Sequence, residues 1–193
     1  MLLAPVELAH ASRLVNHGPT VLVVTEHQGR RNVMAAASSM PVEFTPPRIA
    51  VVVDKMTFTR EVLQASGGFA IGLPCPALAD LTYAVGRECG REVDKFSRHG
   101  IRSVRGTVLG LPLVAGCVAW LELRHIPEPH VESDYDTVFG EVVSAQADER
   151  AFTAGRSSFR DDNAELHTLH HLGGGEFAVP SRIVRASLTG NKS

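Results

Sequence analysis

Short runs of β-branched and aliphatic residues recur along the chain, and Gly, Pro and Asn separate most of them, as is typical of β-strands joined by turns. The pattern predicts strands at residues 20–25, from 31 onward, and at 49–53, 69–73, 115–125, 137–145 and 177–179. Only Gln28-Gly29-Arg30 separates the first two strands, so we expect them to form an antiparallel hairpin. The run at 49–53 is apolar at every position, which favours a strand buried on both faces.

Helical spacing of apolar residues occurs in fewer places. It predicts a short N-terminal helix at residues 6–15, another at 77–85 and a brief one at 149–153. A further helix is expected to begin where Thr57 or Thr59 can cap it and to run to about Ser66, where Gly67 stops it.

Many short strands with few helices predict a mainly β, α+β fold, in which a closed or nearly closed β-barrel carries peripheral helices. The chain of 193 residues has neither an internal repeat nor a biased linker, so we expect one domain over residues 1–193. Two segments rich in charge interrupt the apolar pattern. We expect residues 86–100 to lie on the surface, and residues 154–165 to form an irregular, mobile arm.

Charge and cysteine content narrow the function classes. A net charge of -2 gives no electrostatic argument for a nucleic-acid partner. No apolar run approaches the roughly 20 residues that span a bilayer, and the N-terminus lacks the pattern of a signal peptide. The three cysteines, Cys75, Cys89 and Cys117, form no CxxC motif, which argues against a disulfide framework and favours a cytoplasmic location. Cys89 has only Arg87 and Arg91 as basic sequence neighbours, too little to predict a reactive thiol.

Residues 32–47 contain the candidate ligand-binding stretch. A strand gives way there to a run of small residues at 35–39, before the double proline Pro46-Pro47. Small side chains let a ligand lie close to backbone amides, and the hydroxyls of Ser38 and Ser39 add further polar groups. The same run is also compatible with tight packing of Ala35 to Ala37 in a β core, and the residues alone leave both interpretations open.

Several motifs, each weak by itself, follow one another in an order that is similar to a known family. They are the strand at 20–25; Asn32-x-Met34 with the small run and Pro46-Pro47; Thr59 before a helix and Gly68-Phe69-Ala70-Ile71; Asp94-Lys95-Phe96; Gly140-Glu141-Val142; and Leu172-Gly173-Gly174-Gly175-x-Phe177. From about residue 15 to 184 the chain resembles the flavin reductase-like family of FMN-binding split barrels, which includes flavoredoxins and NAD(P)H:flavin oxidoreductases.

The resemblance implies a six-stranded split barrel that forms a homodimer and binds FMN near the dimer interface. It implies that the segment from Asn32 to Ser39 follows the isoalloxazine and ribityl chain, where donors stabilise the negative charge of a reduced flavin. Thr59 would meet the phosphate at a helix start, and Lys95 would add a positive charge. The full set of expected cofactor-binding residues is Asn32, Met34, Ala35, Ala36, Ser38, Ser39, Thr59, Lys95 and Phe177.

Two departures from the family pattern concern the second substrate. Many members have an aromatic residue at the position of Ser38, and many have Gly-Asp-His where this chain has Ser133-Asp134-Tyr135. Tyr135 can stack or donate a hydrogen bond, but it does not titrate near neutral pH as histidine does. Tyr135 and His170 are therefore candidates for the open face of the flavin, without an assigned acid or base role, and direct use of a nicotinamide is the activity that the departures put in question.

The leading hypothesis is an FMN-dependent oxidoreductase that takes hydride from NADH or NADPH. It would pass electrons to a small-molecule acceptor such as free flavin or ferric iron, to a monooxygenase partner or to a redox protein. The first alternative is an FMN-binding electron carrier without its own NAD(P)H oxidation. A third hypothesis, a split barrel that holds haem, rests only on His167, His170 and His171. A metal site is not predicted, because His167 and His171 share a helical face without an obvious third ligand.

Overall fold

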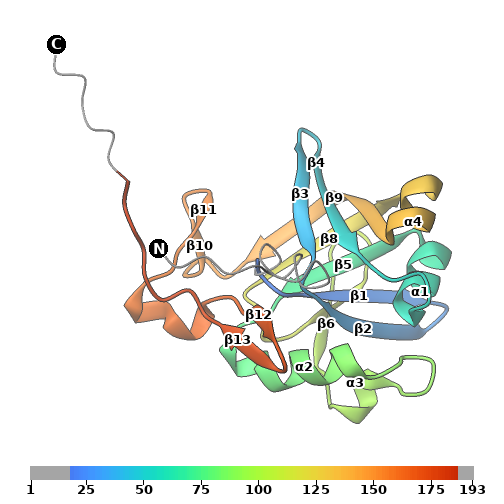
Figure 1. Cartoon of the computed structure of the whole chain (residues 1–193), viewed down its shortest axis with the longest axis horizontal. Helices are drawn as coiled ribbons and strands as arrows, with labels where there is room; N and C mark the ends of the chain where they lie inside the picture. The colour runs from blue at the N-terminus through green and yellow to red at the C-terminus, as the bar shows by residue number, and fades with distance from the viewer. Residues whose placement is uncertain (1–17, 187–193) are drawn as a thin grey trace, which may run out of the picture.

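The computed structural model describes residues 18–186 of the chain, and a seven-stranded antiparallel sheet in the order β2-β1-β5-β8-β9-β4-β3 forms its centre (Figure 1). Its strands are β1 (Val21–His27), β2 (Arg30–Ala36), β3 (Ser39–Phe44), β4 (Pro47–Val52), β5 (Gly68–Leu73), β8 (Ala119–Ile126) and β9 (Thr137–Ala147). Three two-stranded sheets accompany it: β6 (Ser103–Arg105) with β7 (Pro112–Val114), β10 (Phe152–Thr153) with β11 (Arg156–Ser157), and β12 (His170–Gly173) with β13 (Glu176–Ala178).

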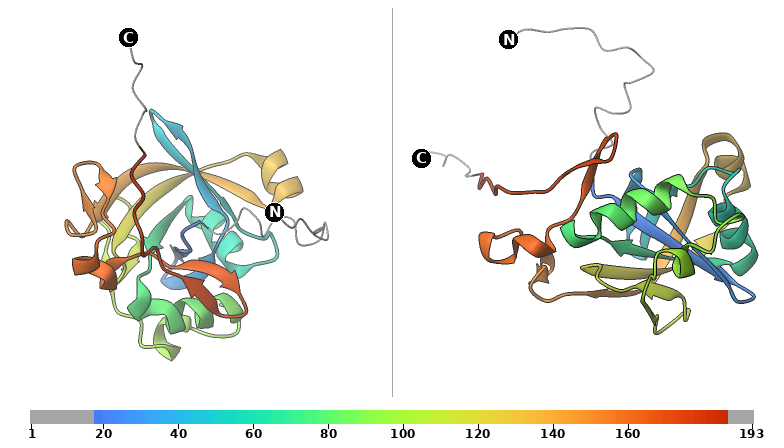
Figure 2. Two further views of the ribbon diagram at one scale, coloured as in Figure 1. Left: turned by 60° about the vertical axis from the view of Figure 1, so that its left-hand side comes forward. Right: turned by 90° about the horizontal axis from the view of Figure 1, so that it is seen from below.

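The helices lie at the periphery of the sheet, as the mainly β prediction requires. They are α1 (Phe58–Ser66), α2 (Ala79–Arg87), α3 (Lys95–Arg98) and α4 (Pro129–Tyr135), with short 3-10 helices η2 (Pro76–Leu78) and η3 (Asp161–Leu166). The view from below in Figure 2 shows α2 and the β12–β13 hairpin close to each other on one side of the sheet. No helix within residues 18–186 is both long and apolar enough to cross a membrane.

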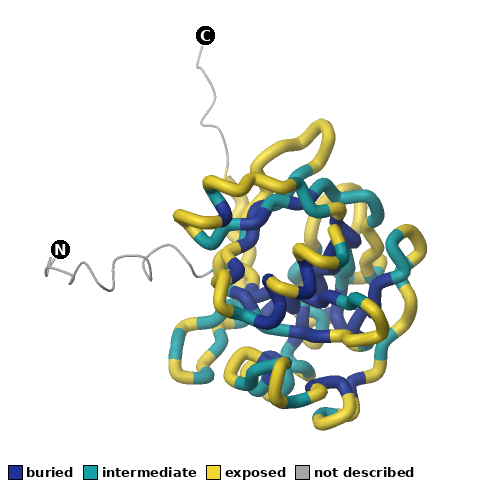
Figure 3. Tube along the Cα trace, turned by 90° about the vertical axis from the view of Figure 1, so that its right-hand side faces the viewer, coloured by how far each residue is buried: buried dark blue, intermediate teal, exposed yellow. Residues whose placement is uncertain are grey.

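Strand β1 is buried on both faces because its apolar residues alternate between two hydrophobic clusters. Leu22 and Val24 pack in a cluster that includes residues of α2, α3 and β7. Val21 and Val23 point the other way, into a cluster that includes Leu63 of α1 and residues of β5, β8 and β9. The tube in Figure 3 shows these buried segments surrounded by exposed loops.

The local signals for α1 place its ends correctly. The Thr57 side chain accepts a hydrogen bond from Arg60 N, as an N-cap does, and Gly67 ends the helix in the left-handed conformation with φ of 70°. The hairpin predicted around Gln28-Gly29-Arg30 is also present as β1–β2. The helix predicted at residues 6–15 lies outside the described residues.

Other predictions were wrong because long-range contacts decide the local structure. No separate strand was predicted at residues 39–44, which are exposed along almost their whole length, but they pair with β4 as strand β3 at the edge of the main sheet. Residues 149–153 form a turn and strand β10 instead of a helix. Residues 154–165 are not irregular throughout, because they include β11 and most of η3, and Asn163 donates to the carbonyl oxygens of Arg150 and Ser158.

Candidate functional site

Asn32 and Thr59 meet in the interior, although they lie on different elements. Asn32 is 2% exposed on β2, and its Nδ2 donates to Thr59 Oγ1 over 2.7 Å. Because Thr57 caps α1, the Thr59 hydroxyl in the first helical turn is available for this contact. Asn32 pairs with Thr25 inside the sheet, so the alternative that it only closes the turn after Arg30 was wrong.

The carbonyl oxygen of the Asn32 side chain is buried and accepts no hydrogen bond from the described residues. Such an atom is costly in a folded protein, because it has lost its contact with water. It lies against Gly90, where an added Cβ would come within 2.1 Å of it. A polar ligand beside Asn32 would supply the missing donor.

Lys95 is a buried cation at the start of α3. Its Nζ donates to Val33 O on β2 over 2.8 Å and to Val85 O on α2 over 2.7 Å, and the residue is only 3% exposed. Burial lowers the pKa of Lys95, while the nearby Cys89 and Glu88 act in the opposite direction. An ammonium group carries three donor protons, so one remains for a ligand after these two bonds. The prediction that the whole of residues 86–100 lies on the surface was wrong, because the Lys95 ammonium and the Phe96 ring are both buried.

These groups line a cavity of about 300 Å³ between β2, the start of α1 and the loop after α2. It is bounded by Asn32, Met34, Asp54, Met56, Thr57, Phe58, Thr59, Val85, Gly86, Arg87, Glu88, Cys89, Gly90 and Lys95. We call it the lysine cavity. Its wall offers the Lys95 ammonium and the Thr59 hydroxyl as donors for a phosphate, and the Asn32 side-chain oxygen as an acceptor for a hydroxyl. The Thr57 hydroxyl, by contrast, already donates to Asp54 O.

A second cavity of about 280 Å³ continues along β2 and shares Gly86 and Arg87 with the first. Its wall is formed by Thr20, Ala35, Ala36, Ala37, Thr82, Tyr83, Gly86, Arg87, His171, Gly174 and Phe177. We call it the aromatic cavity. The small-residue run packs here against α2, since a Cβ at Gly86 would lie 3.4 Å from Ala35 Cβ, and it also faces the cavity. The packing of the run in the protein interior is therefore confirmed, and its role in ligand binding stays a prediction.

The β12–β13 hairpin forms the outer wall of the aromatic cavity. Its His171 and Phe177 rings lie 5.3 Å apart, and Gly175 lies so close to α2 that an added Cβ would be 3.2 Å from the Tyr83 ring. The Arg87 guanidinium lies over the same tyrosine ring, 5.5 Å from its centroid. The hairpin thus places aromatic rings opposite the small residues of β2.

The structure brings most of the predicted site residues together. Asn32, Met34, Thr59 and Lys95 line the lysine cavity, and Ala35, Ala36 and Phe177 line the aromatic cavity. The other four predicted residues line neither cavity. Ser38 is exposed and Ser39 begins β3. Tyr135 is 65% exposed at the end of α4, and His170 Nε2 lies 3.0 Å from Thr168 Oγ1.

Sequence reasoning missed Tyr83 and Arg87, and it placed Cys89 in a surface loop instead of a cavity wall. His171, which with His170 was a candidate for lining a substrate pocket, does line the aromatic cavity. Tyr83 and Arg87 are four residues apart and so share a face of α2, but Arg87 lies beyond the helix predicted at 77–85. Contrary to the expected helical face, His167 follows η3 and His171 belongs to β12. Within residues 18–186 no group of three or more His, Cys, Asp or Glu side chains is arranged to hold a metal ion.

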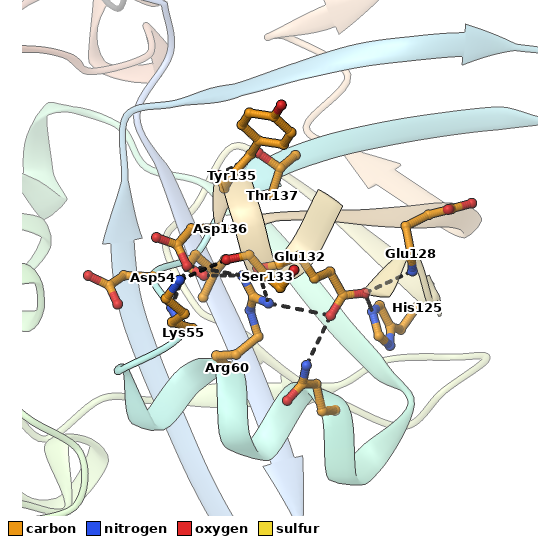
Figure 4. Close-up of polar contacts among 12 residues, drawn as sticks. Asp54, Lys55, Arg60, His125, Glu128, Glu132, Ser133, Tyr135, Asp136 and Thr137 are labelled. Atoms are coloured by element: carbon orange, nitrogen blue, oxygen red, sulfur yellow. Dashed lines mark hydrogen bonds and ion pairs between the residues drawn. The ribbon is translucent and has the colours of Figure 1, made fainter. Parts of the chain in front are cut away.

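A separate buried polar cluster fixes α4 against α1 and β8 (Figure 4). Glu132 accepts hydrogen bonds from Gln64 Nε2 at 2.9 Å and Arg60 NH1 at 3.4 Å, and it also bonds His125 Nε2 at 2.8 Å. Burial alone would raise the pKa of Glu132, but hydrogen bonds from Glu128 N, Gln64 and His125 lower it below its usual value. The cluster lines neither of the two cavities along β2, and its role in the fold is to anchor α4.

Comparison with known proteins agrees with this geometry. The model of the flavin reductase like domain matches residues 13–166, most of the chain. The chain belongs to the flavin reductase-like family. The split-barrel fold and the resemblance noted from the sequence are thereby confirmed.

Relatives cover nearly the whole chain of this family member. The uncharacterized protein YddH of Escherichia coli K12 is 55% identical over 94% of this chain and 97% of its own length. The crystal structure of an FMN-binding domain of a flavin reductases-like enzyme from Shewanella baltica is 42% identical, with a TM-score of 0.85 over 95% of this chain and 97% of that one. Flavoredoxin of Desulfovibrio vulgaris is 25% identical, with a TM-score of 0.73 over 89% and 91%.

Proposed function

We propose that this protein is an FMN-binding oxidoreductase whose cofactor lies along β2, through both cavities. The observation that carries the proposal is the buried pair of groups in the lysine cavity: the Lys95 ammonium, with one proton left to donate, and the Asn32 carbonyl oxygen, which lacks a donor. Burying either group without a ligand is unfavourable. The Shewanella baltica relative, of which 97% is covered by this chain, is an FMN-binding domain.

The polar groups of the lysine cavity suit the phosphate and ribityl chain of FMN, and the walls of the aromatic cavity suit its ring. Lys95 and Thr59 would hold the phosphate, and the Asn32 carbonyl oxygen would accept from a hydroxyl of the ribityl chain. The flat, apolar ring would lie on Ala35 and Ala36, where no bulky side chain prevents close approach, with Phe177 on the opposite wall. Ser38 and Ser39, which line neither cavity, remain proposals as ligands from outside the cavity wall.

Bound FMN would supply a ring that accepts a hydride and releases electrons singly or in pairs. We propose that NADH or NADPH is the donor and that the acceptor is a free flavin, ferric iron, a monooxygenase partner or a small redox protein, in the cytoplasm. The residues of the chain orient the cofactor and exclude water, and no acid or base is assigned, because hydride transfer needs none. Tyr135 and His170 remain candidates for contacts with the second substrate from outside the described cavities.

An electron carrier without NAD(P)H oxidation is the second candidate function. It is favoured by the position of Tyr135, which replaces the histidine of the family pattern and lies exposed at the end of α4, away from both cavities. In this case a partner protein would reduce the flavin.

We also propose a homodimer that pairs through the β3–β4 hairpin. Strand β3 is an edge of the main sheet, and the hairpin projects from the body of the molecule in Figure 1. Phe44 at its tip is 86% exposed and Met40 is 60% exposed. An exposed apolar edge strand of this kind favours pairing with another chain.

The visible absorbance spectrum tests the function directly. Protein is mixed with FMN, freed of excess, and treated without oxygen first with NADH and then with NADPH. Retained flavin absorbance that bleaches rapidly supports the reductase and identifies its donor, whereas absorbance that persists until dithionite is added supports the carrier. Protein that retains no flavin and does not oxidise NAD(P)H with added FMN would contradict both, and a Soret band in the purified protein would favour the haem hypothesis.

A further inference from the structure

Cys89 lies in the wall of the lysine cavity, next to the groups proposed to hold the FMN phosphate. The residue follows α2 and is partly exposed, in contrast to the buried Cys75 and Cys117. The amides of Glu92 and Val93 both donate to the Cys89 carbonyl oxygen over 3.1 Å, which fixes the turn that holds the thiol. Cys89 therefore lines the cavity from a backbone position that hydrogen bonds fix.

The fold supplies the cation that the local sequence lacks. Arg87 and Arg91 are the basic residues close to Cys89 in sequence, but the structure also places the Lys95 ammonium within electrostatic range of the thiol. Cysteines that react with oxidants and electrophiles typically lie in partly exposed positions beside a cation. Cys89 thus has both the exposure and the surroundings of a reactive thiol.

The other two thiols do not share these surroundings. Cys75 and Cys117 are each 5% exposed, and the Cys75 thiol lies 3.4 Å from the carbonyl oxygen of Gly116. Burial, with a smaller contribution from Cys75, raises the pKa of Cys117 far above that of an ordinary thiol. Oxidation of the folded protein should therefore select one cysteine of three.

A second observation indicates that the cavity beside Cys89 receives a polar ligand. Asn32 lines the same cavity, is 2% exposed, and has a side-chain carbonyl oxygen without a hydrogen-bond donor. A group attached to the Cys89 sulfur would occupy the space in which that ligand binds. An attached tripeptide would compete with a bound nucleotide for this cavity of about 300 Å³.

We propose that Cys89 is an oxidative modification site, at which hydrogen peroxide followed by a small thiol such as glutathione forms a mixed disulfide that excludes FMN. This inference rests on the proposed function, both for the occupant of the cavity and for a source of oxidant, since reduced flavin that reacts with oxygen gives hydrogen peroxide.

The modification of Cys89 takes place in two steps. The Cys89 thiolate attacks one peroxide oxygen, a sulfur–oxygen bond forms, the oxygen–oxygen bond breaks and hydroxide leaves, so that sulfur loses two electrons and peroxide gains them. The sulfenic acid then condenses with the small thiol to a disulfide and releases water. A reducing thiol reverses the modification by exchange.

The experiment uses the full-length protein freed of flavin, treated with hydrogen peroxide and then with reduced glutathione. Peptide mass spectrometry locates the adduct, and FMN affinity is measured by quenching of FMN fluorescence. We expect one adduct at Cys89, an FMN affinity lower by about a hundredfold because the site volume is filled, and full recovery with dithiothreitol. Saturating FMN before treatment should slow the modification by about tenfold or more, since it occupies the cavity.

Two serine variants serve as matched controls. Cys75→Ser should respond to the treatment as the native protein does. In Cys89→Ser the affinity for FMN should be the same before and after treatment, whatever its starting value.

An adduct at Cys75 or Cys117 instead of Cys89, or an oxidised protein that binds FMN as tightly as the untreated one, would overturn the proposal. If the untreated protein does not bind FMN, the proposed function fails and the exclusion of FMN fails with it. The position of the adduct then still decides whether Cys89 is the reactive thiol.

Discussion

Replacement of Lys95 by methionine tests the central electrostatic argument of the site. The substitution keeps a chain of similar length and removes the ammonium that donates to Val33 O and Val85 O from within the lysine cavity. We expect Lys95→Met to weaken FMN binding strongly. The effect on folding should be smaller than that of an ordinary buried defect, because two opposing contributions partly cancel.

The magnitude for binding follows from the charge-assisted hydrogen bond to phosphate. Such a bond contributes about 1.5–3 kcal/mol, which corresponds to a rise in the FMN dissociation constant of roughly 10- to 150-fold. For folding, two carbonyl oxygens lose their donor, at about 1–3 kcal/mol each. The removal of a buried charge offsets part of this cost, as the lowered pKa of Lys95 indicates.

The assay is a titration of FMN fluorescence at several pH values, together with urea unfolding of the apoprotein. Because burial lowers the pKa of Lys95, the ammonium of the apoprotein loses its proton at a pH below the usual lysine range. FMN affinity should therefore fall as the pH rises through that lowered pKa, and Lys95→Met should abolish this part of the pH dependence. The free energy of unfolding of the native apoprotein should rise over the window between the lowered and the usual pKa, since the unfolded chain binds more protons there.

Lys55→Met is the matched control. Lys55 is exposed, donates to Ser133 O over 2.7 Å and lines neither cavity along β2, so its loss should leave FMN affinity within about twofold. A Lys95→Met protein that folds and binds FMN as tightly as the native protein, with the same pH dependence, would refute the assignment of the phosphate site.

Three further substitutions test the buried Glu132 cluster, the loop that holds Gly90 and the proposed dimer interface at Phe44. Glu132→Gln breaks a buried ion pair and should lower the free energy of unfolding by about 3 kcal/mol at neutral pH in urea titrations. Since the folded pKa of Glu132 is lowered, its stabilisation is present above the unfolded pKa and is lost as the pH falls, so the native and variant proteins should converge in acid. Gly90→Ala brings a Cβ to 2.1 Å from the Asn32 side-chain oxygen and should reduce FMN affinity about tenfold in the same fluorescence titration, whereas Gly18→Ala, with no neighbour within 4 Å, should not. Phe44→Asp should convert the proposed dimer to a monomer in light scattering without loss of folded structure, and an unchanged mass would place the interface elsewhere.

Much of the scaffold was predictable from the sequence because its signals are local. The Thr57 cap and Gly67 stop fix the ends of α1 within the residues of that helix. The turn at Gln28-Gly29 fixes the first hairpin, and both residues take the positive φ angles that such a turn requires. The order of motifs along the chain also identified the family, and with it the cofactor proposed here.

Elements that long-range pairing defines, and that have no strong local signal, were missed. Strand β3 is exposed along almost its whole length, so it lacks the alternation of buried and exposed residues that reveals a strand, and its pairing with β4 defines it. The brief helix expected at 149–153 failed because β10 pairs with β11 and competes with helical hydrogen bonds. The spacing of apolar residues along the chain predicts neither the β3–β4 pairing nor the β10–β11 pairing.

The sequence by itself determined most strands of the main sheet, the helix α1 and the family, because hydrophobic period, caps and turns act between near neighbours. Only the tertiary structure decided the surroundings of the site. Asn32 and Thr59 are 27 positions apart, and Lys95 donates to a carbonyl 62 positions away. Whether such a lysine is solvated or buried, and whether Cys89 has a cation beside it, depends on which segments the fold packs together, and this packing sets the desolvation and electrostatics of both groups.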